Sequence, residues 1–134
     1  MIRDLVAAYA HAADRGRFDE VAGLFAPTGE LELPDGRRLV GPAAIREFLD
    51  ATGTTLRSAA AAPASLRHHV SSHRIVVESA EAAAGYAYFL VVAAAGPDHW
   101  GRYADRYVRV DGRWLFASRR VRVDGRALTS SFSG

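Results

Sequence analysis

Four residue types are missing from this chain of 134 residues: cysteine, lysine, asparagine and glutamine. Without cysteine the chain can form no disulfide, offers no thiolate nucleophile and cannot bind zinc or an iron–sulfur cluster through sulfur. Without lysine it cannot form a Schiff base with a carbonyl substrate. Any chemistry therefore rests on His, Asp, Glu, Arg, Tyr, Ser, Thr or backbone groups.

A strong excess of one charge is missing as well. All 17 basic residues are arginines, and they are scattered among 15 acidic residues to give a net charge of only +2. A nucleic-acid-binding domain usually gathers its basic residues on one face. The arginines best placed to do so are Arg106, Arg109, Arg119, Arg120 and Arg122. We expect these to lie on a solvated sheet face, and we expect no nucleic-acid partner.

Long hydrophobic runs are absent too. No apolar stretch reaches the ~18 residues that a membrane span needs, and the first residues do not read as a secretory signal. We therefore expect a cytoplasmic protein with no membrane partner. The length suits one domain over residues 1–134, and the sequence contains no repeat or linker.

The first half of the chain has the periodicity of helices. Apolar residues recur at helical spacing over residues 2–14, and Gly16 suits the end of that helix. A second short helix is predicted over Phe18–Phe25. Residues 29–41 predict a hairpin around a Pro-Asp-Gly turn, and a third helix is predicted from Pro42.

The second half has the composition of strands. Residues 52–66 are small and polar, so we predict a mobile loop there. From His68 onward the chain is rich in β-forming residues, with turns predicted at Gly96-Pro97-Asp98 and Asp111-Gly112 and a tail over residues 124–134. Helices followed by an antiparallel meander predict an α+β fold with helices packed on one face of a curved sheet.

Three histidines lie together in "RHHVSSHRI". In a strand, His69 and His73 would be about 13 Å apart, too far to share a zinc ion that needs ligands at ~2.1 Å. We therefore predict no metal site. His68 and His69 are adjacent and should point to opposite faces. One of them could act as a general base if it met a carboxylate in a cavity, although the spacing alone fits a structural histidine better.

The order of several motifs resembles the SnoaL-like (polyketide cyclase/dehydratase-like) branch of the nuclear transport factor 2-like superfamily. The motifs are Tyr9 and Asp14 at the Y-x4-D spacing, then "GPAAIREFL", "RHHVSSHRI" and "GRYADRYVRVDGRW". The resemblance covers residues 2–123. It implies a cone: a strongly curved antiparallel sheet wrapped around a pocket and closed by the N-terminal helices.

The resemblance also implies a catalytic set. In the dehydratases and the lindane dehydrochlorinase, an Asp at the end of the first helix pairs with a His that opens a strand, which here are Asp14 and His68. Tyr9 matches a tyrosine found five residues before that Asp in the bile acid dehydratases. Tyr9, Asp14 and His68 are therefore the catalytic residues that we expect.

Further positions are implied for substrate binding. Counting from Trp114, the pocket arginine of the dehydrochlorinase matches Arg119, although a slip of one residue would replace it by Arg120. The family's aromatic residue on the preceding strand matches Tyr103, and Asp105 shares its face by alternation. We expect Tyr103, Asp105 and Arg119 to bind the substrate.

Together these residues imply a cofactor-independent acid–base enzyme of natural-product or small-molecule metabolism. The Asp–His pair would take a proton next to a carbonyl, leading to dehydration, isomerisation or cyclisation of a small hydrophobic oxygenated substrate. One alternative is a non-catalytic ligand-binding or dimerisation module of the same fold. Another is a limonene-type epoxide hydrolase. The outer sheet face, with Tyr86 and Tyr88, is expected to form a homodimer.

Overall fold

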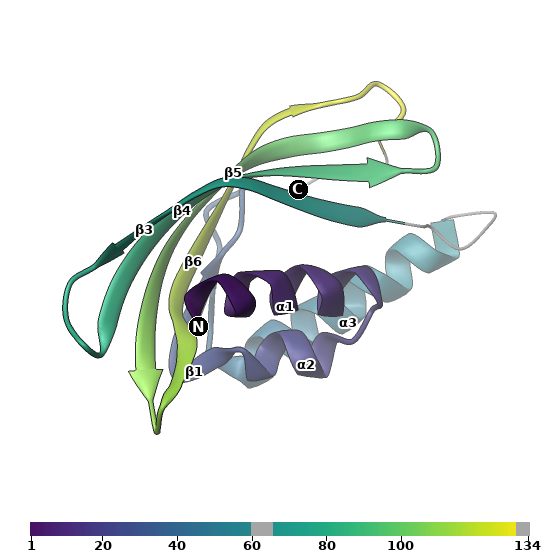
Figure 1. Ribbon diagram of the computed structural model, residues 1–134. Helices are drawn as coiled ribbons and strands as arrows, with labels where there is room; N and C mark the ends of the chain where they lie inside the picture. The colour runs from purple at the N-terminus through teal and green to yellow at the C-terminus, as the bar shows by residue number, and fades with distance from the viewer. Residues whose placement is uncertain (60–65, 131–134) are drawn as a thin grey trace.

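The computed structural model describes residues 1–59 and 66–130, and only the backbone of residues 54–59. The described chain forms three helices and one curved six-stranded sheet (Figure 1). The helices are α1 (Ile2–Asp14), α2 (Phe18–Gly23) and α3 (Pro42–Ala59). The strands are β1 (Phe25–Glu32), β2 (Arg38–Val40), β3 (Arg67–Val77), β4 (Ala82–Ala93), β5 (Gly96–Val110) and β6 (Arg113–Arg126).

The strand order is β2-β1-β6-β5-β4-β3, so β3 and β2 are the edges of the sheet. The meander from β3 to β6 is antiparallel, as the sequence predicts, and so is the β1–β2 hairpin. The pair β1–β6 is parallel, which makes the sheet mixed rather than wholly antiparallel. The pairing is parallel because the chain leaves β1 through β2 and α3 and returns only at its last strand.

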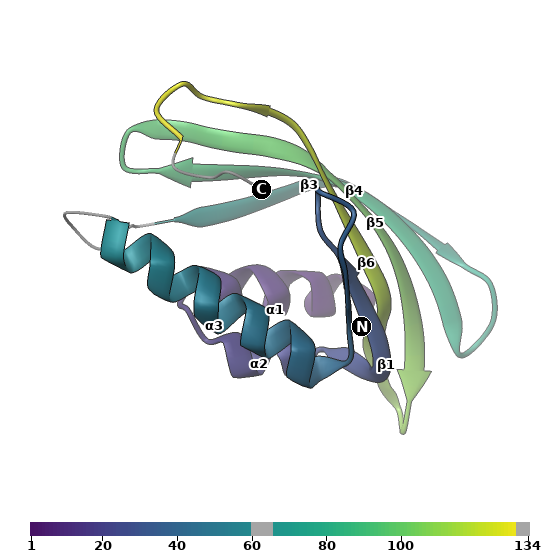
Figure 2. The same cartoon turned by 180° about the vertical axis from the view of Figure 1, so that it is seen from behind.

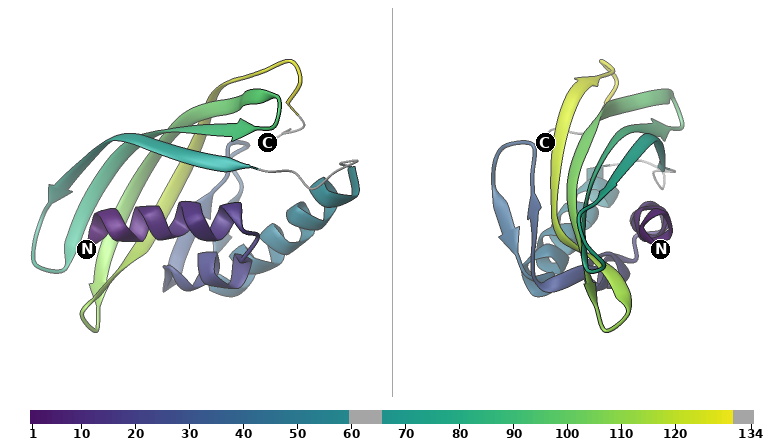
Figure 3. Two further views of the ribbon diagram at one scale, coloured as in Figure 1. Left: turned by 45° about the vertical axis from the view of Figure 1, so that its right-hand side comes forward. Right: turned by 60° about the vertical axis from the view of Figure 1, so that its left-hand side comes forward.

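The helices all lie on the concave face of the sheet. Figure 3 shows α1 crossing beneath the sheet, and Figure 2 shows α3 beside it from behind. The apolar stripe predicted on α1 packs there against the sheet. The resulting core contains buried residues of α1, α2, α3 and the sheet: Ile2, Leu5, Val6, Tyr9, Val21, Phe25, Leu31, Ile45, Tyr107 and Phe116. A second buried cluster on the inner face of β4 and β5 consists of Ala87, Phe89, Val91 and Tyr103.

Three predicted boundaries are wrong. Residues 52–59 belong to α3 rather than to a loop. Alanine favours helix, and no proline occurs between Pro42 and Pro63. Residues 60–65 of the predicted loop lie outside the described residues. Helix α2 ends at Gly23, a poor helix former, and Phe25 already opens β1. The tail also begins later than predicted, because β6 continues to Arg126.

The turns that separate the last strands are only partly as predicted. The β4–β5 turn lies at residues 94–95, because Ala93 pairs with Gly96 and the positive φ of Gly96, +115°, lets the next strand begin there. The turn at Asp111 and Gly112 is confirmed, with φ of +50° and +77° as a two-residue hairpin turn requires.

Within the described residues, no helix combines the length and apolarity needed to cross a membrane.

Candidate active site

Asp14 is the last residue of α1, and the helix ends there because Gly16 adopts a φ of +69°. The Gly16 amide donates to the Ala13 carbonyl and the Arg17 amide donates to the Ala12 carbonyl, which is the double hydrogen bond of a glycine-terminated helix. This ending holds the Asp14 side chain against the start of β3.

His68 meets Asp14 at that point. Its Nδ1 lies 2.6 Å from Asp14 Oδ1, and its backbone amide donates to the same oxygen at 3.0 Å. Both side chains are largely enclosed, with exposed fractions of 20% for His68 and 11% for Asp14. A carboxylate can only accept, so Nδ1 carries the proton and Nε2 presents a lone pair. Among the described residues, none donates to or accepts from that Nε2.

The other two histidines of the motif lie on opposite faces of the sheet. His69 is exposed and pairs with Leu90 on the outer face. A β-bulge between Ser71 and Arg74, with Ser72 at a φ of +53°, turns His73 inward. His73 and His69 therefore cannot share a metal ion, and no group of three His, Asp or Glu side chains in the described chain is arranged to hold one.

A buried ion pair lies deeper in the interior. Arg119 donates through Nε to Asp105 Oδ1 at 2.9 Å and through Nη2 to Oδ2 at 3.1 Å, and both side chains are 0% exposed. Arg120 points outward, so Arg119 is the one of these two neighbours whose side chain faces the interior. Burial acts against the charge on Arg119, but the Asp105 carboxylate outweighs it and raises the pKa of the guanidinium.

Aromatic rings enclose this guanidinium. Its central carbon lies 3.6 Å from the ring centre of Tyr103, 4.3 Å from that of Tyr9 and 4.6 Å from that of Phe116. Such cation–π contacts favour the buried charge where no water can reach it. The Nη1 atom of Arg119 has no hydrogen-bond partner among the described residues.

Asp105 does not face open space. Besides Arg119 it accepts a 2.8 Å hydrogen bond from the Tyr107 hydroxyl, which in turn lies 3.0 Å from His73 Nε2. Because the Tyr107 proton goes to the carboxylate, His73 must donate through Nε2. Burial lowers the pKa of His73 and raises that of Tyr107. Asp105, which the sequence predicts as a substrate contact, is thus bound in the structure by Arg119 and Tyr107.

Tyr9 and Tyr103 pack on the ion pair. Their ring centres are 6.2 Å apart, and both rings lie against the Arg119 guanidinium. Burial raises the pKa of both phenols above the ordinary value, so both remain protonated hydrogen-bond donors. The predicted residues therefore form two contacting groups, Asp14 with His68 and Tyr9 with Tyr103, Asp105 and Arg119.

A second histidine–carboxylate pair lies in β5, next to the turn predicted at Gly96-Pro97-Asp98. His99 is a buried residue of β5, and its Nδ1 lies 2.7 Å from Asp98 Oδ2, which also accepts a hydrogen bond from Ser130. Burial lowers the pKa of His99. His68 and His99 face Val91 from its two sides, since each pairs with it in register. The adjacent Asp98 and His99 in "GPDHW" are the sequence feature that could have indicated this pair.

Comparison with known proteins agrees with this architecture. The model of the SnoaL-like domain matches residues 1–120. A solved structure of a variant of Rv3472 from Mycobacterium tuberculosis, described as a function unknown protein, is 29% identical, with a TM-score of 0.79 over 98% of this chain and 75% of that one. No curated protein matches the sequence.

Two further solved structures extend the comparison. A protein from Catenulispora acidiphila, in complex with S-DNPA, is 29% identical, with a TM-score of 0.77 over 92% of this chain and 90% of that one. An NTF2-like protein with a cystatin-like fold from Novosphingobium aromaticivorans is 24% identical, with a TM-score of 0.78 over 94% and 82% of the two chains. The match of the domain model to nearly the whole chain, on the fold described above, shows that this protein belongs to the SnoaL-like domain family.

Proposed function

We propose that this protein is a cofactor-independent acid–base enzyme in which His68, oriented by Asp14, removes a proton from carbon next to a carbonyl group. The SnoaL-like family includes polyketide cyclases and dehydratases. The observation that carries the proposal is the 2.6 Å contact between His68 Nδ1 and Asp14, which leaves Nε2 as the basic nitrogen.

The proton transfer would proceed in one step. His68 Nε2 takes the proton, the electrons of the broken C–H bond form a carbon–carbon double bond, and the carbonyl oxygen becomes an enolate. Asp14 stabilises the resulting imidazolium. The enolate can then expel a β-hydroxyl group, which takes the proton back from the His68 imidazolium and leaves as water. It can instead regain that proton at another carbon, or attack a second carbonyl whose oxygen then takes the proton. These outcomes correspond to dehydration, isomerisation and cyclisation.

The phenols of Tyr9 and Tyr103 are suited to stabilise the enolate oxygen, because burial keeps both protonated. Arg119 is a positioning residue in this proposal, since its guanidinium lies against both rings.

The surroundings of His68 favour a hydrophobic substrate. The wall beside it is apolar, with Val91 opposite His68 in register and Phe89, Leu66 and Val70 in the same cluster. The related protein from Catenulispora acidiphila was solved in complex with S-DNPA, which supports a ligand-binding role for the fold. A small oxygenated molecule with an apolar skeleton fits these features.

Deuterium exchange tests the proton abstraction without knowledge of the natural product. A panel of hydrophobic enolisable ketones, beginning with 2-tetralone, is incubated with the protein in D2O, and NMR follows loss of the α-proton signal. We expect the wild type to accelerate exchange and His68→Ala to lose at least about 100-fold of that acceleration. His69→Ala, an exposed neighbour on the other face, is the matched control. Exchange that is unaffected by His68→Ala would refute the assignment.

One observation favours a non-catalytic module instead. Asp14 also accepts the backbone amide of His68, so the contact has a structural role of its own. In that case ketones would bind without exchange in any variant. The epoxide hydrolase is not supported, because within the described residues no second carboxylate contacts the Arg119–Asp105 pair.

A further inference from the structure

The outer face of the sheet, opposite to His68, contains a hollow of about 350 Å³. Its outward-facing side chains come from the four adjacent strands β3 to β6: Arg74, Tyr86, Tyr88, Arg102, Ala104, Arg120 and Arg122. Its volume lies at the lower end of the range for small-molecule sites.

Strand register explains the hollow. Arg74, Tyr86, Ala104 and Arg120 are consecutive partners in one row across the sheet. Tyr88, Arg102 and Arg122 are consecutive partners in the adjacent row. Ala104 is the only small side chain among these seven, so the long side chains around it rise above it and Ala104 forms the floor.

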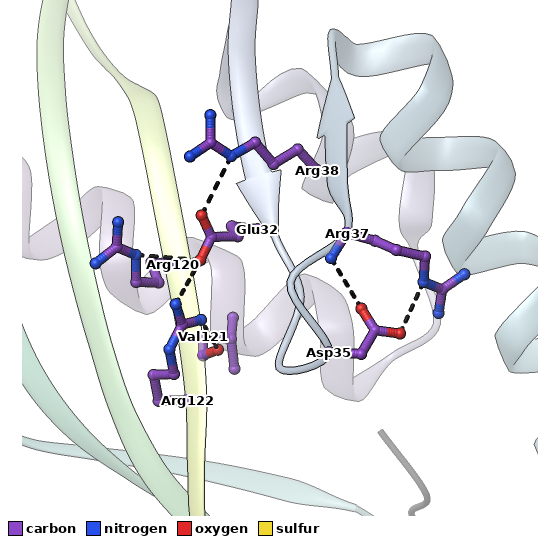
Figure 4. Close-up of polar contacts among 7 residues, drawn as sticks. All are labelled: Glu32, Asp35, Arg37, Arg38, Arg120, Val121 and Arg122. Carbon is purple, nitrogen blue, oxygen red and sulfur yellow. Dashed lines mark hydrogen bonds and ion pairs between the residues drawn. The ribbon is translucent and has the colours of Figure 1, made fainter.

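Positive charge is in excess around this floor. Three of the four arginines that line the hollow, Arg102, Arg120 and Arg122, share only two carboxylates, Glu32 and Asp124. Glu32 interacts with three arginines, as Figure 4 shows. It lies 3.2 Å from Arg120, 2.6 Å from Arg122 and 3.3 Å from Arg38.

Arg74 adds a charge with no counterion. It forms no ion pair with any side chain that the structure describes, and it is exposed on β3. Tyr86 and Tyr88 flank the hollow, with 56% and 58% of their surface exposed. Guanidinium groups bind phosphate and carboxylate oxygens through paired hydrogen bonds, and tyrosine provides both a ring face and a hydroxyl donor.

We propose that this hollow is a binding site for a small organic phosphate. The phosphate oxygens lie above Ala104 and are contacted by Arg74, Arg120 and the free nitrogens of Arg102 and Arg122. Tyr86 and Tyr88 contact the organic part. The site lies on the face of the sheet opposite to the Asp14–His68 pair and is independent of the proposed reaction.

The homodimer expected from the sequence would use this same face. The excess positive charge around the hollow disfavours such a dimer. A twofold interface brings the same patch of each copy together, so the excess positive charge of one chain would lie against that of the other. Like charges in contact are unfavourable unless an anion separates them. A phosphate removes that repulsion, whereas a second copy adds to it.

Calorimetric titration of the full chain with phenyl phosphate at low ionic strength tests the site, with inorganic phosphate and benzoate as comparison probes. Arg74→Ala removes the arginine without a counterion, and Ala104→Phe fills the floor while every charge is kept. Arg46→Ala, on the exposed surface of α3, is the matched arginine control. Circular dichroism and thermal unfolding confirm that each variant is folded.

We expect saturable binding of phenyl phosphate with a Kd of about 1 mM or lower, weakened at least about tenfold by Arg74→Ala and by Ala104→Phe and unchanged by Arg46→Ala. Absence of saturation by the wild type, or equal binding by all variants, overturns the site. Benzoate that binds as tightly as phenyl phosphate overturns the assignment to phosphate. A wild type that dimerises in sedimentation velocity and becomes monomeric in Ala104→Phe, with no phosphate binding, assigns the face to a second copy instead.

Discussion

The Asp14 carboxylate accepts two hydrogen bonds from the same residue, one from the backbone amide of His68 and one from its imidazole. Strand β3 is an edge of the sheet, so this amide has no neighbouring strand on that side. Asp14 therefore joins the end of α1 to the sheet edge and orients the imidazole at the same time.

The two roles of Asp14 can be separated by substitution. Asp14→Asn keeps an acceptor oxygen but removes the charge that stabilises an imidazolium, so we expect a folded protein with at least about 100-fold slower exchange of 2-tetralone. Asp14→Ala also leaves the amide unpaired and should lower the free energy of unfolding by a further 1–3 kcal/mol, roughly, in urea denaturation. Wild-type exchange rates in Asp14→Asn would show that the pair is only structural.

The Arg119–Asp105 pair predicts a large asymmetry between single and double variants. Arg119→Met leaves a buried carboxylate without its partner, and we expect a loss of about 3–5 kcal/mol in urea denaturation. The double variant Arg119→Met with Asp105→Leu should be more stable than Arg119→Met alone, because no buried charge remains. Arg120→Met, on the exposed side of β6, should change stability by less than about 1 kcal/mol. A double variant that loses the sum of both single effects would argue against a coupled pair.

Gly85 makes room for Tyr107. A Cβ at this position would collide with the Tyr107 hydroxyl and ring. Gly85→Ala should therefore displace the Tyr107 hydroxyl from Asp105 and cost about 1–3 kcal/mol of stability. Gly23→Ala in α2, where nothing lies within 4 Å of the new methyl group, is the control and should not destabilise the protein. Urea denaturation measures both, and equal effects would show that Gly85 has no special role.

Acidification should weaken the fold through His99. Burial lowers the pKa of this imidazole in the folded protein. The unfolded chain therefore binds a proton at His99 more readily than the folded chain does, so a falling pH favours unfolding. The stabilisation is complete above about pH 6.5, the ordinary histidine pKa, and is lost as the pH falls through the lower folded value. In thermal unfolding from pH 7.5 to 5, His99→Gln should lose less stability than the wild type. His69→Gln, at an exposed position, should follow the wild-type curve.

The periodic parts of the fold could be predicted from the sequence. The apolar stripe of residues 2–14 and the alternating strands after His68 each bury one face, and burial of a face is what produces such a pattern. The later part of α3 has no such stripe, so its helix could not be recognised. The parallel β1–β6 pair joins segments far apart in the sequence, and no local sequence pattern predicts that these two strands pair.

The candidate site could be predicted only in part. Residues 14 and 68 were paired through motif resemblance, because nothing in their own neighbourhoods brings them together. The inward turn of His73 was hidden by the bulge at Ser72, which breaks the two-residue alternation. The buried His99–Asp98 pair could not be predicted, because the sequence indicates a turn at residues 96–98 whereas the turn lies at residues 94–95.

The parallel pairing of β1 with β6 has a consequence for how the chain folds. Phe25 and Phe116 are partners in this pair although about 90 residues separate them, and the amide of Phe116 donates to the carbonyl of Leu24. During synthesis the apolar faces of α1, α2 and β1 cannot be fully buried until β6 has left the ribosome. Distant contacts of this kind slow folding and prolong the exposure of apolar surface. The nascent chain should therefore depend on chaperones until β6 has been made.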